Sequence, residues 1–160
     1  MSENNETSLS ALLERGGVYH NIPGVNPREI LTALIAALPD FPALDKTQLL
    51  KAVLEREALM PTGLGRGIAL PHPRSPMLGI GGKPFMAVAF PALPLDWEAL
   101  DGKEIGTVIL IVSASSKQHL NTLSKVIFLC QQENIYPLFE AKASGKEIIA
   151  ALKEAENGWK

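Results

Sequence analysis

Apolar residues recur every three or four positions in several stretches of the chain, which is the spacing of an amphipathic helix. Each stretch starts at a residue that caps helices and stops at glycine, proline or a polar turn. The pattern predicts helices from Thr7 or Ser8 to Gly16-Gly17, from Asn26-Pro27 to Pro39, from Asp45 with Arg56-Glu57 near the end, from Ser115 or Ser116 to Cys130, from Tyr136 to Ala143, and from Ser144 to Glu154.

Shorter apolar runs between these helices predict strands over residues 18–22, 68–70, 85–90 and 107–112. The run 107–112, TVILIV, is the most β-branched and is therefore the expected central strand. Asp101-Gly102 is a hairpin signal shortly before it. Because strands and helices interleave but a hairpin intrudes, the sequence predicts an α/β fold. We expect a mixed parallel and antiparallel sheet with helices on both faces.

Length and composition narrow the class of protein. The 160 residues favour one domain, residues 7–157, after a disordered polar tail, residues 1–6. A net charge of −2 without a basic block argues against nucleic acid as a partner. No apolar run approaches the roughly 20 residues of a membrane span, and the N-terminus does not resemble a signal peptide. The single cysteine, Cys130, excludes an internal disulfide and favours a cytoplasmic location.

The candidate chemistry lies in residues 56–76, REALMPTGLGRGIALPHPRSP. Glycines at alternate positions leave main-chain N–H groups uncovered, and successive N–H groups form a nest for an anion such as phosphate. The glycines of this nest are Gly63, Gly65 and Gly67. His72 follows the predicted strand 68–70 and stands between two prolines, which stiffen its position. We therefore expect a histidine at a strand end, beside a phosphate-binding loop.

The same segment resembles the active-site segment of the fructose/mannitol-type enzyme IIA domains of the bacterial sugar phosphotransferase system. Their pattern is Arg-Glu, then Thr-Gly-hydrophobic-Gly, one residue, and Gly-Ile-Ala-Ile-Pro-His. The matching residues are Arg56, Glu57, Thr62, Gly63, Gly65, Gly67, Ile68, Ala69, Pro71 and His72, with Leu64 and Leu70 in hydrophobic slots. The resemblance spans about residues 8–155, implies the same layered fold, and points in particular to the stand-alone nitrogen-regulatory branch.

Two histidines are the expected centre of the chemistry. His72 is the expected phosphoryl acceptor, because an imidazole with a pKa near 6.5 keeps a free lone pair at neutral pH. His119 is the expected phosphoryl stabiliser, since QHLNTL is similar to the segment of the family's second histidine. At the start of a helix, its N–H would donate to a phosphoryl oxygen. The alternative for His119 is a histidine on the helix surface.

Arginine and threonine side chains complete the expected site. Arg56 would contact either the phosphoryl group or the backbone of the glycine loop. Thr62 would either donate its hydroxyl to the phosphate or cap the loop. Arg66 and Arg74 are expected near His72, as phosphate ligands or as solvated charges. Pro73 replaces the small residue that the family usually has there, and it removes one N–H from the expected nest.

Other chemistry finds no support in the sequence. Three histidines without an HExxH motif or clustered cysteines argue against a metal site, and the absence of a P-loop argues against a nucleotide. We therefore expect no cofactor. His20 is expected to be structural or exposed, and Cys130 is expected to be a buried thiol on the apolar face of its helix.

The resemblance also implies the partners. His72 would receive its phosphoryl group from a histidine-containing phosphocarrier protein. It would then pass the group to the cysteine of a IIB domain in sugar uptake, or act as a switch on a regulatory target. The absence of a fused IIB or membrane segment favours the regulatory role. Either role needs an apolar docking rim, and the candidates are Met60, Leu64, Met77, Leu78 and Ile80.

Overall fold

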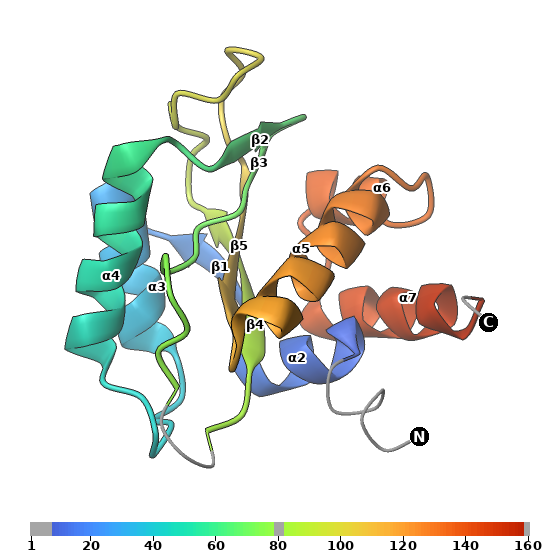
Figure 1. Ribbon diagram of the computed structural model, residues 1–160. Coiled ribbons are helices and arrows are strands. Elements are labelled where there is room, and N and C mark those ends of the chain that lie inside the picture. Colours follow the sequence, from blue (N-terminus) through green and yellow to red (C-terminus); the bar gives the residue numbers. More distant parts are fainter. Residues whose placement is uncertain (1–7, 79–81, 159–160) are drawn as a thin grey trace.

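A computed structural model describes residues 8–78 and 82–158, and within them five strands form one sheet (Figure 1). The strands are β1 (Val18–Ile22), β2 (Gly63–Gly65), β3 (Ile68–Ala69), β4 (Phe85–Pro91) and β5 (Thr107–Val112), in the spatial order β1-β4-β5-β3-β2. The β1–β4 and β3–β5 pairs are parallel, whereas the β4–β5 and β2–β3 pairs are antiparallel. The predicted mixed sheet and its central strand are confirmed. The expected polar tail, residues 1–6, lies outside the described residues.

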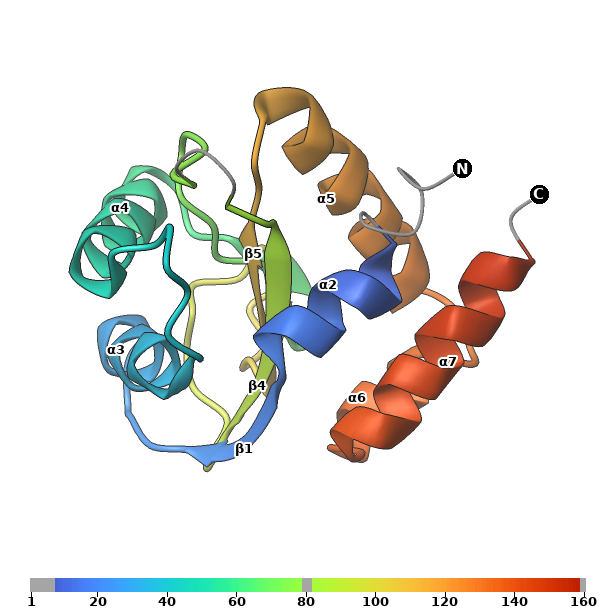
Figure 2. The ribbon, with the colours of Figure 1, turned by 90° about the horizontal axis from the view of Figure 1, so that it is seen from below.

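Helices cover both faces of this sheet, as predicted (Figures 1 and 2). One face carries α3 (Pro27–Ala37) and α4 (Lys46–Leu59). The other carries α2 (Leu9–Gly16), α5 (Ser116–Cys130), α6 (Tyr136–Glu140) and α7 (Gly145–Asn157). Successive side chains of β4 and β5 enter separate apolar clusters on the two faces, and every residue of both strands is buried. Within the described residues, no helix combines the length and hydropathy that a bilayer crossing requires.

Side-chain caps start five of the helices where the sequence places them. In each, the capping oxygen accepts a hydrogen bond from the backbone N–H three residues on, which satisfies an otherwise unpaired donor of the first turn. The caps are Ser8, Asn26, Asp45, Ser115 and Ser144. Ser8 and Ser115 thus decide the two helix starts that the sequence left open.

Two local features differ from the prediction, whereas the hairpin signal is confirmed. Strand β2 consists of glycine and leucine, GLG, and its apolar pattern is too short to predict. Helix α6 ends at Glu140 rather than at Ala143, because Lys142 adopts a left-handed conformation with φ of 51°. Asp101-Gly102 forms a turn, in which Gly102 N–H donates to the Ala99 carbonyl at 2.9 Å. An antiparallel bridge between Leu95 and Ile105 encloses this turn within the segment 92–106, so the predicted hairpin is confirmed.

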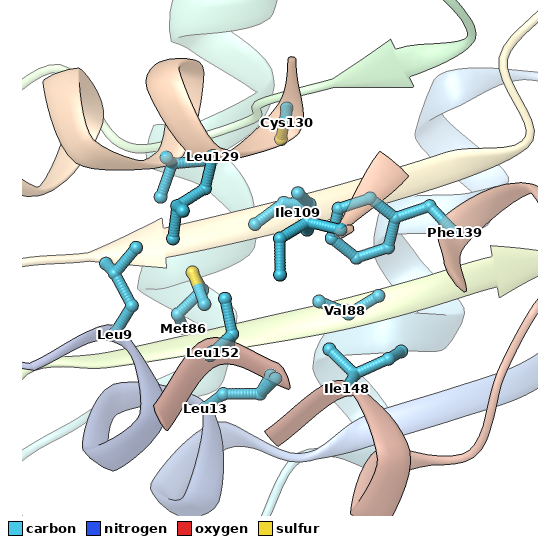
Figure 3. A pocket seen from close by; sticks show the side chains of 12 residues that line it. Leu9, Leu13, Met86, Val88, Ile109, Leu129, Cys130, Phe139, Ile148 and Leu152 are labelled. Atoms are coloured by element: carbon cyan, nitrogen blue, oxygen red, sulfur yellow. The ribbon is translucent and has the colours of Figure 1, made fainter. Parts of the chain in front are cut away.

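The cluster between the sheet and helices α2, α5, α6 and α7 closes around a void of about 10 Å³ (Figure 3). Its lining presents no polar surface, and a void of this size barely reaches the space that one water molecule needs. Cys130 contributes its side chain to this lining, and burial raises the pKa of its thiol to about 12. The prediction that Cys130 is a buried thiol is confirmed.

The two ends of the described chain are joined by one carboxylate. Glu156, near the end of α7, accepts hydrogen bonds from Leu9 N–H at 2.6 Å and from Ser10 N–H at 3.1 Å. It also accepts the Ser10 hydroxyl proton at 2.9 Å. Both N–H groups belong to the first turn of α2, where a negative charge is favourable. Glu156 therefore caps a helix that lies almost the whole chain away in sequence.

We predict that Glu156→Ala lowers the free energy of unfolding by about 1–2 kcal/mol, because it leaves first-turn donors of α2 without their acceptor. Urea unfolding followed by circular dichroism measures the change. Glu154→Ala is the matched control, since Glu154 is exposed on the same helix. Equal stabilities of the two variants would contradict the assigned cap.

Candidate active site

His72 lies at the end of the sheet where β3 and β5 finish. β3 runs parallel to β5, with Ile68 opposite Thr107. The backbone stays tied to β5 beyond the end of β3, because Ile111 N–H donates to the Pro71 carbonyl at 3.1 Å. Parallel strands end at the same edge of a sheet, so His72 emerges beside the segment that leaves β5 and enters α5.

The first turn of α5 carries the second histidine of this site. The ring centroids of His72 and His119 lie 4.6 Å apart, with an angle of 44° between the ring planes. The backbone N–H of His119 donates to the backbone carbonyl of the capping residue Ser115 at 2.9 Å, which fixes the first turn of α5. The fold thus brings together two imidazoles that are far apart in sequence, and His119 is not an isolated surface histidine.

A backbone hydrogen bond decides which nitrogen of His72 carries its proton. Nδ1 lies 2.8 Å from the Leu70 carbonyl oxygen. A carbonyl only accepts, so Nδ1 is the protonated nitrogen and donates to Leu70. In the neutral ring, Nε2 then holds the free lone pair. The half-buried imidazole thus has its free lone pair on one defined atom, Nε2.

Both imidazoles are less basic than usual. Burial lowers the pKa of His72 more than any other effect, and the positive charge of Arg56 lowers it further, against a raising contribution from the Leu70 hydrogen bond. Burial also lowers the pKa of His119, followed by the charges of His72 and Arg56. Because both pKa values are lowered from 6.5, the neutral form of each ring predominates at pH 7.

Arg56, in the last turn of α4, holds its own loop and acts on both histidines through its charge. Its guanidinium donates from Nη1 to the Met60 carbonyl at 2.7 Å. The sequence left open whether Arg56 contacts the loop or the phosphoryl group. The structure gives the loop contact and places the positive charge within electrostatic reach of the imidazoles.

Thr62 is bound by its neighbour Glu57. The Thr62 N–H donates to Oε2 of Glu57 at 2.7 Å, and the Thr62 hydroxyl donates to Oε1 at 2.6 Å. The Thr62 carbonyl accepts from Leu70 N–H at 3.1 Å, two residues before His72. Thr62 therefore caps and anchors the loop, which was one of its two predicted roles, and its hydroxyl proton is already donated.

The glycines do not form the expected nest beside His72. Gly63 pairs with Ala69 and Gly65 with Ile68, so they belong to an antiparallel hairpin. Gly67, with φ of 81°, lies in its turn, where a left-handed conformation is needed. The Gly67 carbonyl accepts hydrogen bonds from the N–H groups of Gly106 and Thr107, at the start of β5. The Pro71 carbonyl, just before His72, accepts from Ile111 near the end of that strand, so the glycine turn and His72 lie toward opposite ends of β5. Gly63, Gly65 and Gly67 thus shape the hairpin instead.

The two loop arginines, Arg66 and Arg74, lie in different parts of the molecule. Arg66, at the tip of the β2–β3 hairpin, stacks its guanidinium over the ring of Tyr136 at 3.9 Å. The Tyr136 hydroxyl donates to the Arg66 carbonyl at 2.8 Å, so the hairpin is held against α6, and the expectation of Arg66 near His72 is wrong. Arg74 instead lines a hollow of about 220 Å³ together with Ser116 and His119.

Apolar side chains are exposed at the end of α4 and next to His119 on α5. Met60, one of the predicted rim residues, is 64% exposed, and Leu120, beside His119, is also 64% exposed. Other predicted rim residues, Leu64, Met77 and Leu78, are half-buried and pack against the core clusters. Ile80 lies outside the described residues. His20 is structural, as expected, since its Nε2 donates to the carbonyls of Lys142 and Ala143 at 3.1 and 3.0 Å.

Two contacts of the site were missed in the sequence. One is the Leu70 carbonyl, which no side-chain pattern could reveal. The other is Ser113, whose hydroxyl lies 3.5 Å from Nδ1 of His119. Its position directly after the apolar run 107–112 is a signal, since polar residues at the ends of parallel strands gather at one edge of the sheet. Among the described residues, no group of three or more potential ligands suits a metal ion.

Comparison with known proteins identifies the family. The sequence profile of the phosphoenolpyruvate-dependent sugar phosphotransferase system EIIA 2 family matches residues 11–155. The chain belongs to this EIIA 2 family. It is 26% identical to a nitrogen regulatory protein of Pseudomonas aeruginosa over 153 residues, which cover 94% of this chain and 97% of the relative.

Other EIIA relatives represent both branches. A fructose-specific EIIA component of Haloferax volcanii is 30% identical over 115 residues, covering 69% of this chain and 73% of the relative. The crystal structure of nitrogen regulatory protein IIA-Ntr from Neisseria meningitidis superposes with a TM-score of 0.73 at 23% identity, covering 84% of this chain and 92% of that one. Family membership implies a phosphoryl-carrying role for this EIIA chain.

We predict that Arg56→Gln raises the pKa of both His72 and His119, because it removes a positive charge that disfavours their protonation. A pH titration of the imidazole resonances by NMR measures the midpoints. In the wild type, both midpoints are expected below 6.5. Arg28→Gln, which neutralises an exposed arginine on α3, is the control and should leave both unchanged. A titration unaffected by Arg56→Gln would refute the electrostatic coupling.

Proposed function

We propose that His72 of this EIIA chain accepts a phosphoryl group on Nε2. The observation that carries the proposal is the hydrogen bond from Nδ1–H to the Leu70 carbonyl at 2.8 Å, because it leaves the lone pair on Nε2. The lowered pKa keeps this lone pair free at neutral pH. Histidine is an established covalent carrier in enzymes, which agrees with the phosphotransferase family of the chain.

The transfer step balances on this geometry. The Nε2 lone pair attacks the phosphorus of a donor phosphohistidine, and a new N–P bond forms. The N–P bond of the donor breaks, and its electron pair returns to the donor's imidazole. Nδ1 of His72 keeps its proton on the Leu70 carbonyl, so the phosphorylated ring is cationic. Onward transfer to the next nucleophile returns the N–P electron pair to Nε2 and restores the starting tautomer.

Two neighbouring groups would stabilise the phosphoryl oxygens during transfer. His119 lies in ring contact with His72, and an N–H of its imidazole would donate to an equatorial oxygen. Arg56 would offset the negative charge that spreads over these oxygens. The Glu57–Thr62 pair would act indirectly, by holding the loop to the backbone just before His72.

The donor in this proposal is a histidine-containing phosphocarrier protein, and the role is regulatory and cytoplasmic. The similarity to a nitrogen regulatory protein over nearly the full length of both chains supports this branch. The phosphoryl group itself carries about −1.5 to −2 charges, partly offset by the cationic ring, and it would lie near the exposed Leu120, where it would weaken an apolar complex with a target protein. The second candidate is sugar uptake with transfer to a IIB cysteine, which the similarity to a fructose-specific EIIA component supports.

We predict that His72→Ala abolishes phosphorylation by the labelled phosphocarrier protein, because no other side chain replaces Nε2. Acid-labile label on the EIIA chain is the measurement. His20→Ala is the matched control, since that histidine contacts only backbone carbonyls and Phe90 among the described residues. Full labelling of the His72→Ala protein would reject the assigned acceptor.

We predict that His119→Ala still becomes phosphorylated but about 10- to 100-fold more slowly, because the acceptor remains while one oxyanion donor is lost. Rapid-quench measurement of label uptake gives the rate. An unchanged rate would rule out the role of His119.

The two branches are separated by the fate of the label. Transfer from phosphorylated EIIA to the cysteine of a IIB protein, with loss of acid-labile label, would support sugar uptake. Binding to a target protein that weakens on phosphorylation would support regulation. A phosphomimetic is unsuitable here, because a carboxylate side chain cannot reproduce the charge and reach of a phosphoimidazole, so the phosphorylated wild type is the required reagent.

A further inference from the structure

Ser113 is a buried polar residue at the junction of β5 and α5. Its exposed fraction is only 4%, and it directly follows the six buried residues of β5, of which five are apolar. Within the described part of the chain, the hydrogen-bond partner of its hydroxyl is Nδ1 of His119, at 3.5 Å. Ser113 also lines the hollow beside His119. A buried hydroxyl at this place is therefore linked to the active-site imidazole.

We infer that Ser113 is a positioning residue that selects the tautomer of His119 with the proton on Nε2. This inference rests on the proposed function, because a tautomer matters here only if His119 donates to a phosphoryl group on His72. Ser113 does not touch the phosphoryl group itself. It acts through the opposite edge of the neighbouring imidazole.

The direction of the Ser113–His119 hydrogen bond follows from the buried hydroxyl. If Nδ1 of His119 carried the proton and donated, the Ser113 hydroxyl proton would have no protein acceptor among the described residues, which is unfavourable. If the hydroxyl donates to Nδ1 instead, both groups are satisfied. Nδ1 is then the acceptor, and the neutral ring must carry its proton on Nε2.

The Nε2–H tautomer suits the proposed transfer. A phosphoryl oxygen on His72 accepts hydrogen bonds, so it is stabilised by a protonated ring nitrogen and repelled by a lone pair. Burial, together with the positive charge of Arg56, lowers the pKa of His119, so the neutral ring predominates near pH 7 and only one of its nitrogens is protonated. The two rings thus have opposite roles: Nε2 of His72 is the nucleophile, whereas Nε2 of His119 is the donor. A long contact in the resting protein commonly tightens when charge develops.

The first test reads the tautomer directly and needs no phosphoryl donor. Long-range ¹H–¹⁵N correlation spectra of the ¹⁵N-labelled wild-type protein at pH 7.5 distinguish protonated from unprotonated ring nitrogens. The expected result is an unprotonated Nδ1 and a protonated Nε2 for His119, with the reverse for His72. A protonated Nδ1 in wild-type His119 would overturn the inference, whether or not any variant folds.

The second test combines tautomer and rate in Ser113→Ala. This substitution should shift His119 toward a mixture of tautomers and slow the phosphorylation of His72 about 10-fold, while Ser113→Thr, which keeps the hydroxyl, restores both. Ser124→Ala, an exposed serine on α5, is the matched control and should behave like the wild type. An unchanged tautomer and rate in Ser113→Ala would overturn the inference. An unphosphorylated wild type would overturn the proposed function, and the spectra would still decide whether Ser113 sets the tautomer.

Discussion

The parallel pairing of β3 with β5 is the constraint on which the site depends. β3 has only two residues, yet its register against β5 determines where His72 emerges. That register places His72 at the same edge of the sheet from which α5 starts. The hydrogen bond from Ile111 to the Pro71 carbonyl extends that register beyond the strand. A shift by one residue would turn the alternate side chains of β3 to the wrong face, and the two imidazoles would no longer meet.

The surroundings of His72 and His119 favour the neutral form of both imidazoles. Desolvation makes protonation of either imidazole unfavourable, and Arg56 adds to this effect. In the proposed transfer, the same positive charge would favour an arriving phosphoryl group. The charge that disfavours protonation of the two rings would thus also attract the anionic group that is transferred. The guanidinium is held by the Met60 carbonyl, so its position does not depend on the ligand.

Local pattern was sufficient for most of the fold. Capping residues and apolar spacing placed the helix starts, and continuous apolar runs revealed β4 and β5, because both strands are buried on two faces. The prediction that the glycines form a phosphate nest was wrong. They belong to the β2–β3 hairpin, and backbone pairing of this kind has no side-chain pattern in the sequence. Arg66 looked close to His72 along the chain, but the hairpin carries it to Tyr136. The histidine pair was predictable only through family resemblance, because its contact depends on the order of strands in the sheet.

The contact of Glu156 with the first turn of α2 has a consequence for how the molecule is made. Leu9 leaves the ribosome long before Glu156 is translated, so the earliest helix emerges without the group that completes it. α2 also packs on β4 and α7, which are synthesised later. Local segments can form during translation, but α2 acquires its carboxylate cap only after α7 has been made. The stability of the early helix α2 is thus set by a residue that is translated much later.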